Sequence, residues 1–96
     1  FYHEFSSNIL LGGDILTPDK IIISEKGVTY EKRNTYLIGK DWVHLSFDNI
    51  SSIRIDRGLI DAEIIISSLG AVEIVAEDFS ISNAKKIEAL VNDQIR

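Results

Sequence analysis

The sequence predicts a mainly β domain of the α+β class, with about seven antiparallel strands followed by one C-terminal helix. Short segments of alternating apolar and polar residues recur along most of the chain, which is the pattern of half-buried strands. Glycine-marked turn signals separate the later segments. The last segment, about Ser82 to Ile95, changes to helical periodicity. A run of strands that ends in one amphipathic helix therefore defines the fold class.

The first part of the chain predicts an irregular arm, a bend and one hairpin. Residues 1–7 are expected to form the N-terminal arm, and Gly12-Gly13-Asp14 a bend, since it lacks the Lys-Ser/Thr pair of a phosphate-binding loop. The β-branched segment 20–24 predicts a strand, and Lys26-Gly27 a tight turn in which glycine accepts a positive φ. Residues 28–33 return as the second strand. For residues 34–40 the sequence is compatible with either a loop or a short extended piece.

The middle of the chain predicts the remaining strands. The clearest begins at Asp41, where one set of residues is expected to face the core and the other to face outward: Val43, Leu45 and Phe47 inward, and Trp42, His44 and Ser46 outward. Later segments present a second inward set, which comprises Ile53, Ile55, Ala62, Ile64, Ile66, Val72, Ile74 and Ala76. Either Ser80 or Ser82 is expected to cap the helix, whose buried stripe is Ala84, Ile87, Val91 and Ile95.

Length and composition limit the classes of protein. Ninety-six residues predict a single domain over 1–96. The chain has no cysteine, so disulfides, zinc–cysteine sites and thiol nucleophiles are excluded. The net charge of −5 argues against broad capture of nucleic acid or anionic lipid, although a local basic patch stays open. We expect action in the cytoplasm or at the cytoplasmic face of a membrane. The compartment stays open because the chain starts at Phe1, contains no methionine and could be a trimmed piece.

The order of elements and several segments resemble the bacterial pleckstrin-homology-like (PH-like) domains. The resemblance lies in residues 20–30, in Trp42 to Ile53, in the hairpin from Ile64 to Ile74, and in the closing segment from Phe79 to Ile87. It covers most of the chain from about Ile9 and consists of apolar positions and turns. It implies a barrel of two nearly orthogonal sheets that is capped by the C-terminal helix. It also implies a domain that binds lipid headgroups, peptides or copies of itself.

The basic residues near the first hairpin define a candidate anionic-ligand site at Lys26, Lys32 and Arg33, with Lys20 nearby. The lipid-binding members of the PH-like family place cations around this hairpin. Here Lys32 and Arg33 are adjacent, so on a strand they point to opposite faces. The negative charges of Glu25 and Glu31 weaken the positive electrostatic potential around this hairpin. The bland interpretation is a solvated hairpin, and the net acidity of the chain disfavours a membrane surface as the partner.

The histidines give little support to catalysis or metal binding. His44, Ser46 and Asp48 follow one another along a single strand, about 6–7 Å apart per step, and therefore diverge from a common reacting atom. A metal site that combines His3 and His44 with Glu4 or Asp41 would require the arm to fold back. We therefore expect no catalytic residues, no metal and no cofactor.

Apolar residues on the outward faces are the candidate partner-binding residues. Trp42 is expected to face away from the core, either as a contact residue or as a cover for a loop or the arm. Ile65 and Val75, like Ile22, are out of phase with their inward neighbours. A contiguous outward patch of such residues would favour burial against a partner or a second copy. Curvature or a bulge that turns some of them inward is the other interpretation.

The sequence therefore favours a non-enzymatic PH-like interaction module that acts as a protein–protein scaffold. Its partner would be a protein or a second copy, held by strand addition at a sheet edge or by apolar packing, with Trp42, Ile65 and Val75 in the contact. Anionic-lipid binding through Lys26, Lys32 and Arg33 is the second hypothesis. Small-molecule binding between helix and sheet is the third, and an enzyme is the last.

Overall fold

The computed structural model describes residues 1–8, 18–33 and 40–96. Within these residues it contains seven strands, a short 3-10 helix and one α-helix. They are β1 (Tyr2–Ser6), β2 (Lys20–Ser24), β3 (Gly27–Arg33), β4 (Lys40–Leu45), η1 (Phe47–Asn49), β5 (Ile50–Arg57), β6 (Asp61–Ser68), β7 (Glu73–Ser80) and α1 (Ile81–Ile95). This confirms the predicted mainly β class with a C-terminal helix. The expected bend at Gly12-Gly13-Asp14 and residues 34–39 lie outside the described residues.

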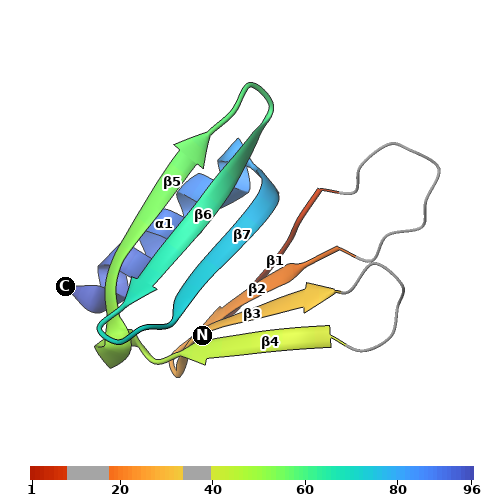
Figure 1. Cartoon of the computed structure of the whole chain (residues 1–96). Helices are drawn as coiled ribbons and strands as arrows, with labels where there is room; N and C mark the ends of the chain where they lie inside the picture. Colours follow the sequence, from red (N-terminus) through yellow and green to blue (C-terminus); the bar gives the residue numbers. More distant parts are fainter. Residues whose placement is uncertain (9–17, 34–39) are drawn as a thin grey trace.

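The strands form two antiparallel sheets, sheet A in the order β1-β2-β3-β4 and sheet B in the order β5-β6-β7. The sheets diverge from the corner at which η1 joins β4 to β5 (Figure 1). No strand ladder joins the two sheets in the described part of the chain, so the expected barrel is not closed. Asn8 N, two residues after β1, donates a backbone hydrogen bond to Asp78 O of β7 at 2.7 Å, where the ends of these two strands come close. The two sheets are bridged instead by α1, which contacts both of them.

The N-terminal segment is a strand, and the expectation of an irregular arm over residues 1–7 was wrong. β1 pairs with β2 over its whole length, with Phe5 opposite Ile21. Phe5 packs against the core, and the rings of Phe1, His3 and Phe5 follow one another at centroid distances of 5.9 and 6.4 Å. The spacing of these rings has period two. An aromatic row of this kind suits a pleated strand, and pairing with β2, which is distant in sequence, supplies the backbone hydrogen bonds of that strand.

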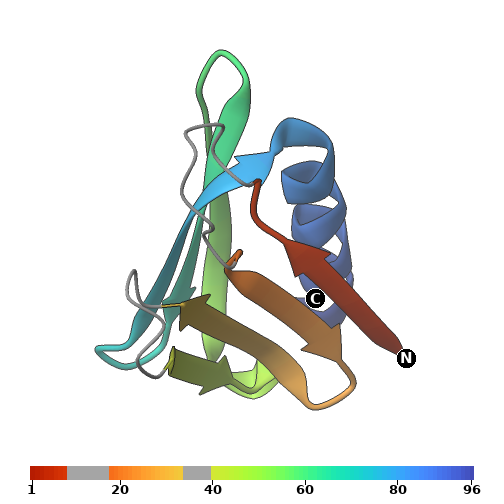
Figure 2. The same ribbon diagram turned by 90° about the vertical axis from the view of Figure 1, so that its right-hand side faces the viewer.

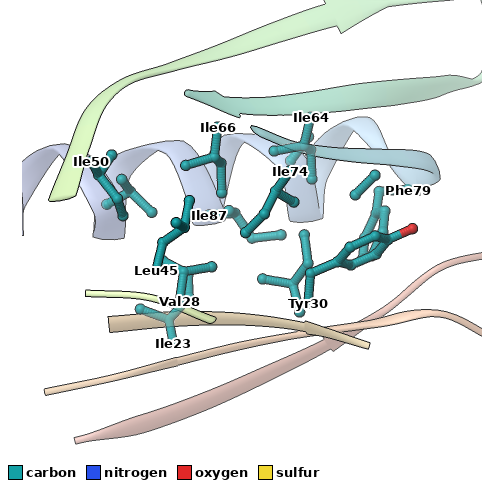
Figure 3. Close-up of a cluster of buried hydrophobic side chains, with 14 of the residues drawn as sticks. Ile23, Val28, Tyr30, Leu45, Ile50, Ile64, Ile66, Ile74, Phe79 and Ile87 are labelled. Carbon is teal, nitrogen blue, oxygen red and sulfur yellow. The ribbon is translucent and has the colours of Figure 1, made fainter. Parts of the chain in front are cut away.

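The core lies between the two sheets and α1 (Figures 2 and 3). Figure 3 shows Val28 and Leu45 of sheet A pointing toward Ile66 and Ile74 of sheet B and toward Ile87 of α1. The largest fully buried side chains are mostly β-branched, as the composition predicted: Phe79, Ile21, Ile23, Ile64, Ile66, Ile74, Ile87, Val28 and Val91. Val72 is the exception to the predicted inward set, because it precedes β7 and is exposed.

The helix is positioned by its cap and by its buried stripe. The Ser80 hydroxyl accepts a hydrogen bond from Asn83 N at 3.1 Å, which selects Ser80 over Ser82 as the N-cap. Ala84, Ile87 and Val91 are fully buried, and Ile95 packs against the same cluster. The predicted stripe is therefore confirmed, and it holds α1 against both sheets.

Candidate functional site

The outward side of sheet A around Trp42 is the surface that most clearly offers a contact site. The register sets Lys20, Glu31 and Trp42 in one cross-strand row, and Ile22, Thr29 and His44 in the next. We call these six residues the Trp42 face. Trp42 is 63% exposed, whereas Ile21, Tyr30 and Leu45 on the opposite side of the sheet are buried. The predicted outward direction of Trp42 is confirmed.

Strand β4, which carries Trp42, is an edge strand. Among the described residues it pairs only with β3, so one side of its backbone has no partner strand. An edge of this kind is a template on which an extended segment of another chain can add by backbone hydrogen bonds. The large exposed indole beside this edge adds apolar area to such a contact.

His44 lies on the Trp42 face and has a structural role. Its Nδ1 lies 2.8 Å from the Thr29 hydroxyl, and its Nε2 lies 3.2 Å from the Lys26 carbonyl oxygen. In the neutral ring, Nε2–H donates to the carbonyl and Nδ1 accepts from Thr29. The imidazole therefore ties β4 to the β2–β3 turn. Both ring nitrogens are occupied by these partners, neither of which is Ser46 or Asp48.

The other two predicted contact residues do not join Trp42. The register places Ile65 between Arg54 and Val75 on the outward side of sheet B. Ile65 is only 5% exposed, so of the two interpretations the covered position is the one observed, and of these two residues only Val75, at 39%, is accessible. Ile22 is partly buried on sheet A. Neighbouring side chains cover β-branched residues on a curved sheet, and a bulge between Ala62 and Ile64 adds to the curvature of β6.

The basic residues of the first hairpin do not form one cluster. Lys26 lies in the β2–β3 turn, and Lys32 lies near the far end of β3, which at ~3.3 Å per residue places them about 20 Å apart along the strand. Lys32 is on the inward side of sheet A with Tyr30, in a hollow that it shares with the acidic residues Asp19, Glu77 and Asp78. The backbone register sets Arg33 opposite Lys40. These positions do not converge on one anionic group.

The ends of β2, β3 and β7 meet in an acidic hollow of about 290 Å³. The Tyr30 hydroxyl donates to Asp19 Oδ2 at 2.9 Å, and burial followed by this bond to a carboxylate raises the pKa of the phenol well above 10.0. Burial, a side-chain hydrogen bond with Asp61 and the charge of that carboxylate raise the pKa of Asp78 above 3.8. Asp78 also adopts a φ of 64°, in the left-handed region. The hollow thus accumulates negative charge.

Sequence reasoning missed this hollow and the tip of the β5–β6 hairpin. Asp19, Asp61 and Asp78 are far apart in sequence, and only the pairing of the strands brings them together. Gly58 is one of the glycines that mark turns between the later segments, but the residues after it, Leu59 and Ile60, were not singled out. They are 100% and 85% exposed. Two large apolar residues directly after a turn glycine were the available signal.

Comparisons of the chain with protein-family models, with curated proteins and with solved structures found no match. Among the described residues, no group of three or more His, Asp or Glu side chains is arranged to hold a metal ion. The described part of the chain contains no helix that is both long and apolar enough to cross a bilayer. The Trp42 face and the free edge of β4 therefore remain the best-defined candidate site.

Proposed function

We propose that this chain is a non-enzymatic, PH-like protein–protein interaction module that binds another polypeptide at the free edge of β4 and on the Trp42 face. The observation that carries the proposal is the position of Trp42, which is 63% exposed on a strand that, within residues 1–8, 18–33 and 40–96, pairs on only one side. Exposed tryptophans are enriched among residues that dominate binding energy. Free strand edges are a recurrent docking route for extended segments.

The other features of the face support a binding role. The sheet beneath it is anchored by the buried side chains Ile21, Val28 and Leu45, so the face is held on a rigid support. His44 is fixed by its two hydrogen bonds, which leaves Trp42 beside an ordered imidazole. A rigid and partly apolar surface loses little conformational entropy when it binds. The partner we favour is a second copy of the chain.

The single tryptophan gives the proposal a direct test. Sedimentation equilibrium of the wild type over a concentration series should show reversible association. Over the same series Trp42 fluorescence should shift to the blue as the indole leaves water. Trp42→Ala should weaken the association. Tyr2→Ala is the matched control, since Tyr2 is also 63% exposed but lies on β1 at the other edge of sheet A.

A Trp42→Ala variant that associates as the wild type does would contradict the proposed binding surface. A wild type that stays monomeric up to about 1 mM would contradict self-association, since an equilibrium this weak corresponds to only about 4 kcal/mol.

A further inference from the structure

The tip of the β5–β6 hairpin exposes two large apolar side chains that the fold does not use. Gly58 N donates to Asp61 O at 2.8 Å and closes a turn whose two central residues are Leu59 and Ile60. Their side chains are 100% and 85% exposed, and in Figures 1 and 2 this hairpin extends past the start of α1. Turn positions favour Gly, Asn, Asp and Pro for conformational reasons that Leu and Ile do not share. Local folding therefore does not explain the apolar tip.

A second acidic hollow, of about 380 Å³, lies at the base of this tip, and we call it the hairpin hollow. Its described lining includes five carboxyl groups and one guanidinium group, which belong to Asp56, Asp61, Glu63, Glu77, Asp78 and Arg57. The hollow adjoins the tip, since a methyl group on Gly58 would lie 3.1 Å from Asp61 Oδ1. Arg54 lies two residues before Asp56 on β5, and the hollow beside Tyr30 adds Asp19 and Lys32. With these three included, six carboxyl groups stand against three cationic groups, so the surface stays acidic.

The fold leaves the negative charge of the hairpin hollow uncompensated. The register sets Asp56 directly opposite Glu63, and like charges in such a cross-strand pair repel each other. Asp61 and Asp78 share a side-chain hydrogen bond, and burial followed by this bond raises the pKa of Asp78. In the described part of the chain, none of the five carboxyl groups forms an ion pair with a lysine or an arginine. A cation supplied by a partner would therefore reduce a repulsion within this hairpin.

The apolar tip and the acidic hollow together select the chemistry of the partner. Opposite charges attract and orient two protein surfaces, so the hollow favours lysine or arginine side chains. The same charge repels anionic lipid headgroups and the phosphates of nucleic acids. The chain itself has a net charge of −5, so a second copy does not supply an excess of positive charge. The partner that fits is a basic polypeptide segment that also carries apolar side chains for the tip.

We propose that the end of the β5–β6 hairpin is a second binding surface, which takes a basic polypeptide segment that also carries apolar side chains. Leu59 and Ile60 pack against the apolar side chains of this segment, and its lysine or arginine side chains enter the hairpin hollow. The surface is separate from the Trp42 face, because the tip and β4 lie at opposite ends of the molecule in Figure 1. The inference goes beyond the proposed function, since it gives the chain a second and different partner.

The test follows amide NMR spectra of the whole chain during titration with three synthetic peptides, each acetylated and amidated. The probe is Gly-Lys-Leu-Lys-Leu-Lys-Gly. In the second peptide serine replaces both leucines, and in the third glutamate replaces the three lysines. The probe should shift the amides of residues 57–61, Glu63 and Glu77 with a Kd of about 1 mM or tighter. The serine peptide should bind at least about threefold more weakly, and the glutamate peptide should not shift these amides.

Two variants separate the apolar tip from the acidic hollow. Leu59→Ser/Ile60→Ser should weaken binding of the probe by about tenfold or more, because it removes the apolar contact. Asp56→Asn/Glu63→Gln should weaken it by about threefold or more, because it removes two negative charges from the hollow. Binding to the wild type should weaken as NaCl rises from about 50 mM to about 300 mM, and this dependence should be smaller in the charge variant.

Each variant has a matched control elsewhere on the surface. Leu69→Ser/Val72→Ser removes two apolar side chains, 71% and 51% exposed, from the other hairpin of sheet B. Asp48→Asn/Asp93→Asn removes the same net charge as the hollow variant, from two exposed residues outside the hairpin hollow. Both controls should bind the probe as the wild type does. The dispersion of the amide spectra shows directly that each variant stays folded.

Four outcomes would overturn the inference. Amides at the tip that do not shift with the probe up to about 5 mM would remove the surface. Shifts confined to Lys40–Leu45 would place the peptide at the edge of β4, so the inference would fail while the proposed function stands. Equal losses in the variants and their controls would show that binding is not specific to the hairpin. Binding of the tip to neutral phosphatidylcholine vesicles, with no response to the probe, would assign Leu59 and Ile60 to a lipid interface.

Discussion

Replacing Ile87 by alanine tests whether α1 is held by its buried stripe. Ile87 is fully buried and is among the residues drawn in the core in Figure 3. The substitution removes about three carbons at ~0.8 kcal/mol each, and the cavity left behind adds to this loss. We expect the free energy of unfolding to fall by about 3–4 kcal/mol. For a domain of this size each kcal/mol lowers Tm by about 4–8 °C, so Tm should fall by more than about 12 °C.

The assay is urea denaturation followed by far-UV circular dichroism, because Trp42 is exposed and reports the core poorly. Lys86→Ala is the control, since Lys86 precedes Ile87 on the same helix and is exposed. That control should lie within about 0.5 kcal/mol of the wild type. A loss of less than about 1 kcal/mol for Ile87→Ala would refute the packing of α1 between the sheets.

Three further substitutions test local features of the fold. Ser80→Ala should cost about 1 kcal/mol by removing the N-cap bond to Asn83, whereas exposed Ser82→Ala should cost less than half as much in the same denaturation assay. Gly27→Ala should lower the free energy of unfolding by about 2 kcal/mol or more, because Gly27 has a φ of 133° and a methyl group there would meet the backbone of Leu45 and Ser46. Gly70→Ala is the control and should be nearly neutral, since the nearest atom to an added methyl group there is Ser68 Oγ at 4.0 Å. Asp78→Asn should change the pH dependence of stability. The pKa of Asp78 is raised in the folded state, so its contribution is present below pH 3.8 and is lost as pH rises through the folded pKa. The wild type should therefore lose stability relative to Asp78→Asn as pH rises from about 3.8 to 7, and parallel pH profiles would contradict a raised pKa of Asp78 in the folded state.

The sequence was sufficient for the elements whose periodicity is strong. Alternation identified β4 and the inward Ile64 and Ile66, and the three-to-four spacing identified the stripe of α1, because each pattern reflects one buried side. It did not identify β1, since a short strand with exposed polar residues becomes evident only when its partner β2 is known. Closure of the barrel also depends on long-range geometry, which local periodicity does not encode.

The candidate site, like the fold, could be predicted from the sequence only in part. Trp42 could be placed outward from its alternation with Val43 and Leu45. Ile65 could not be placed, because its burial depends on neighbours across the sheet and on curvature. The hollow with Asp19 and Asp78 could not be foreseen, since it forms only where β7 comes close to the ends of β2 and β3, which local periodicity does not encode. Local pattern thus gives the direction of a side chain, and tertiary contacts decide what covers it.

Amide hydrogen exchange of β4 at low and high protein concentration tests the central claim most directly. If a second chain binds at the free edge and on the Trp42 face, amides within Lys40–Leu45 should exchange more slowly as concentration rises. Amides of β1, the other edge of sheet A, should exchange at the same rate throughout. Protection that grows on β1 while β4 stays unchanged would contradict the proposed binding surface.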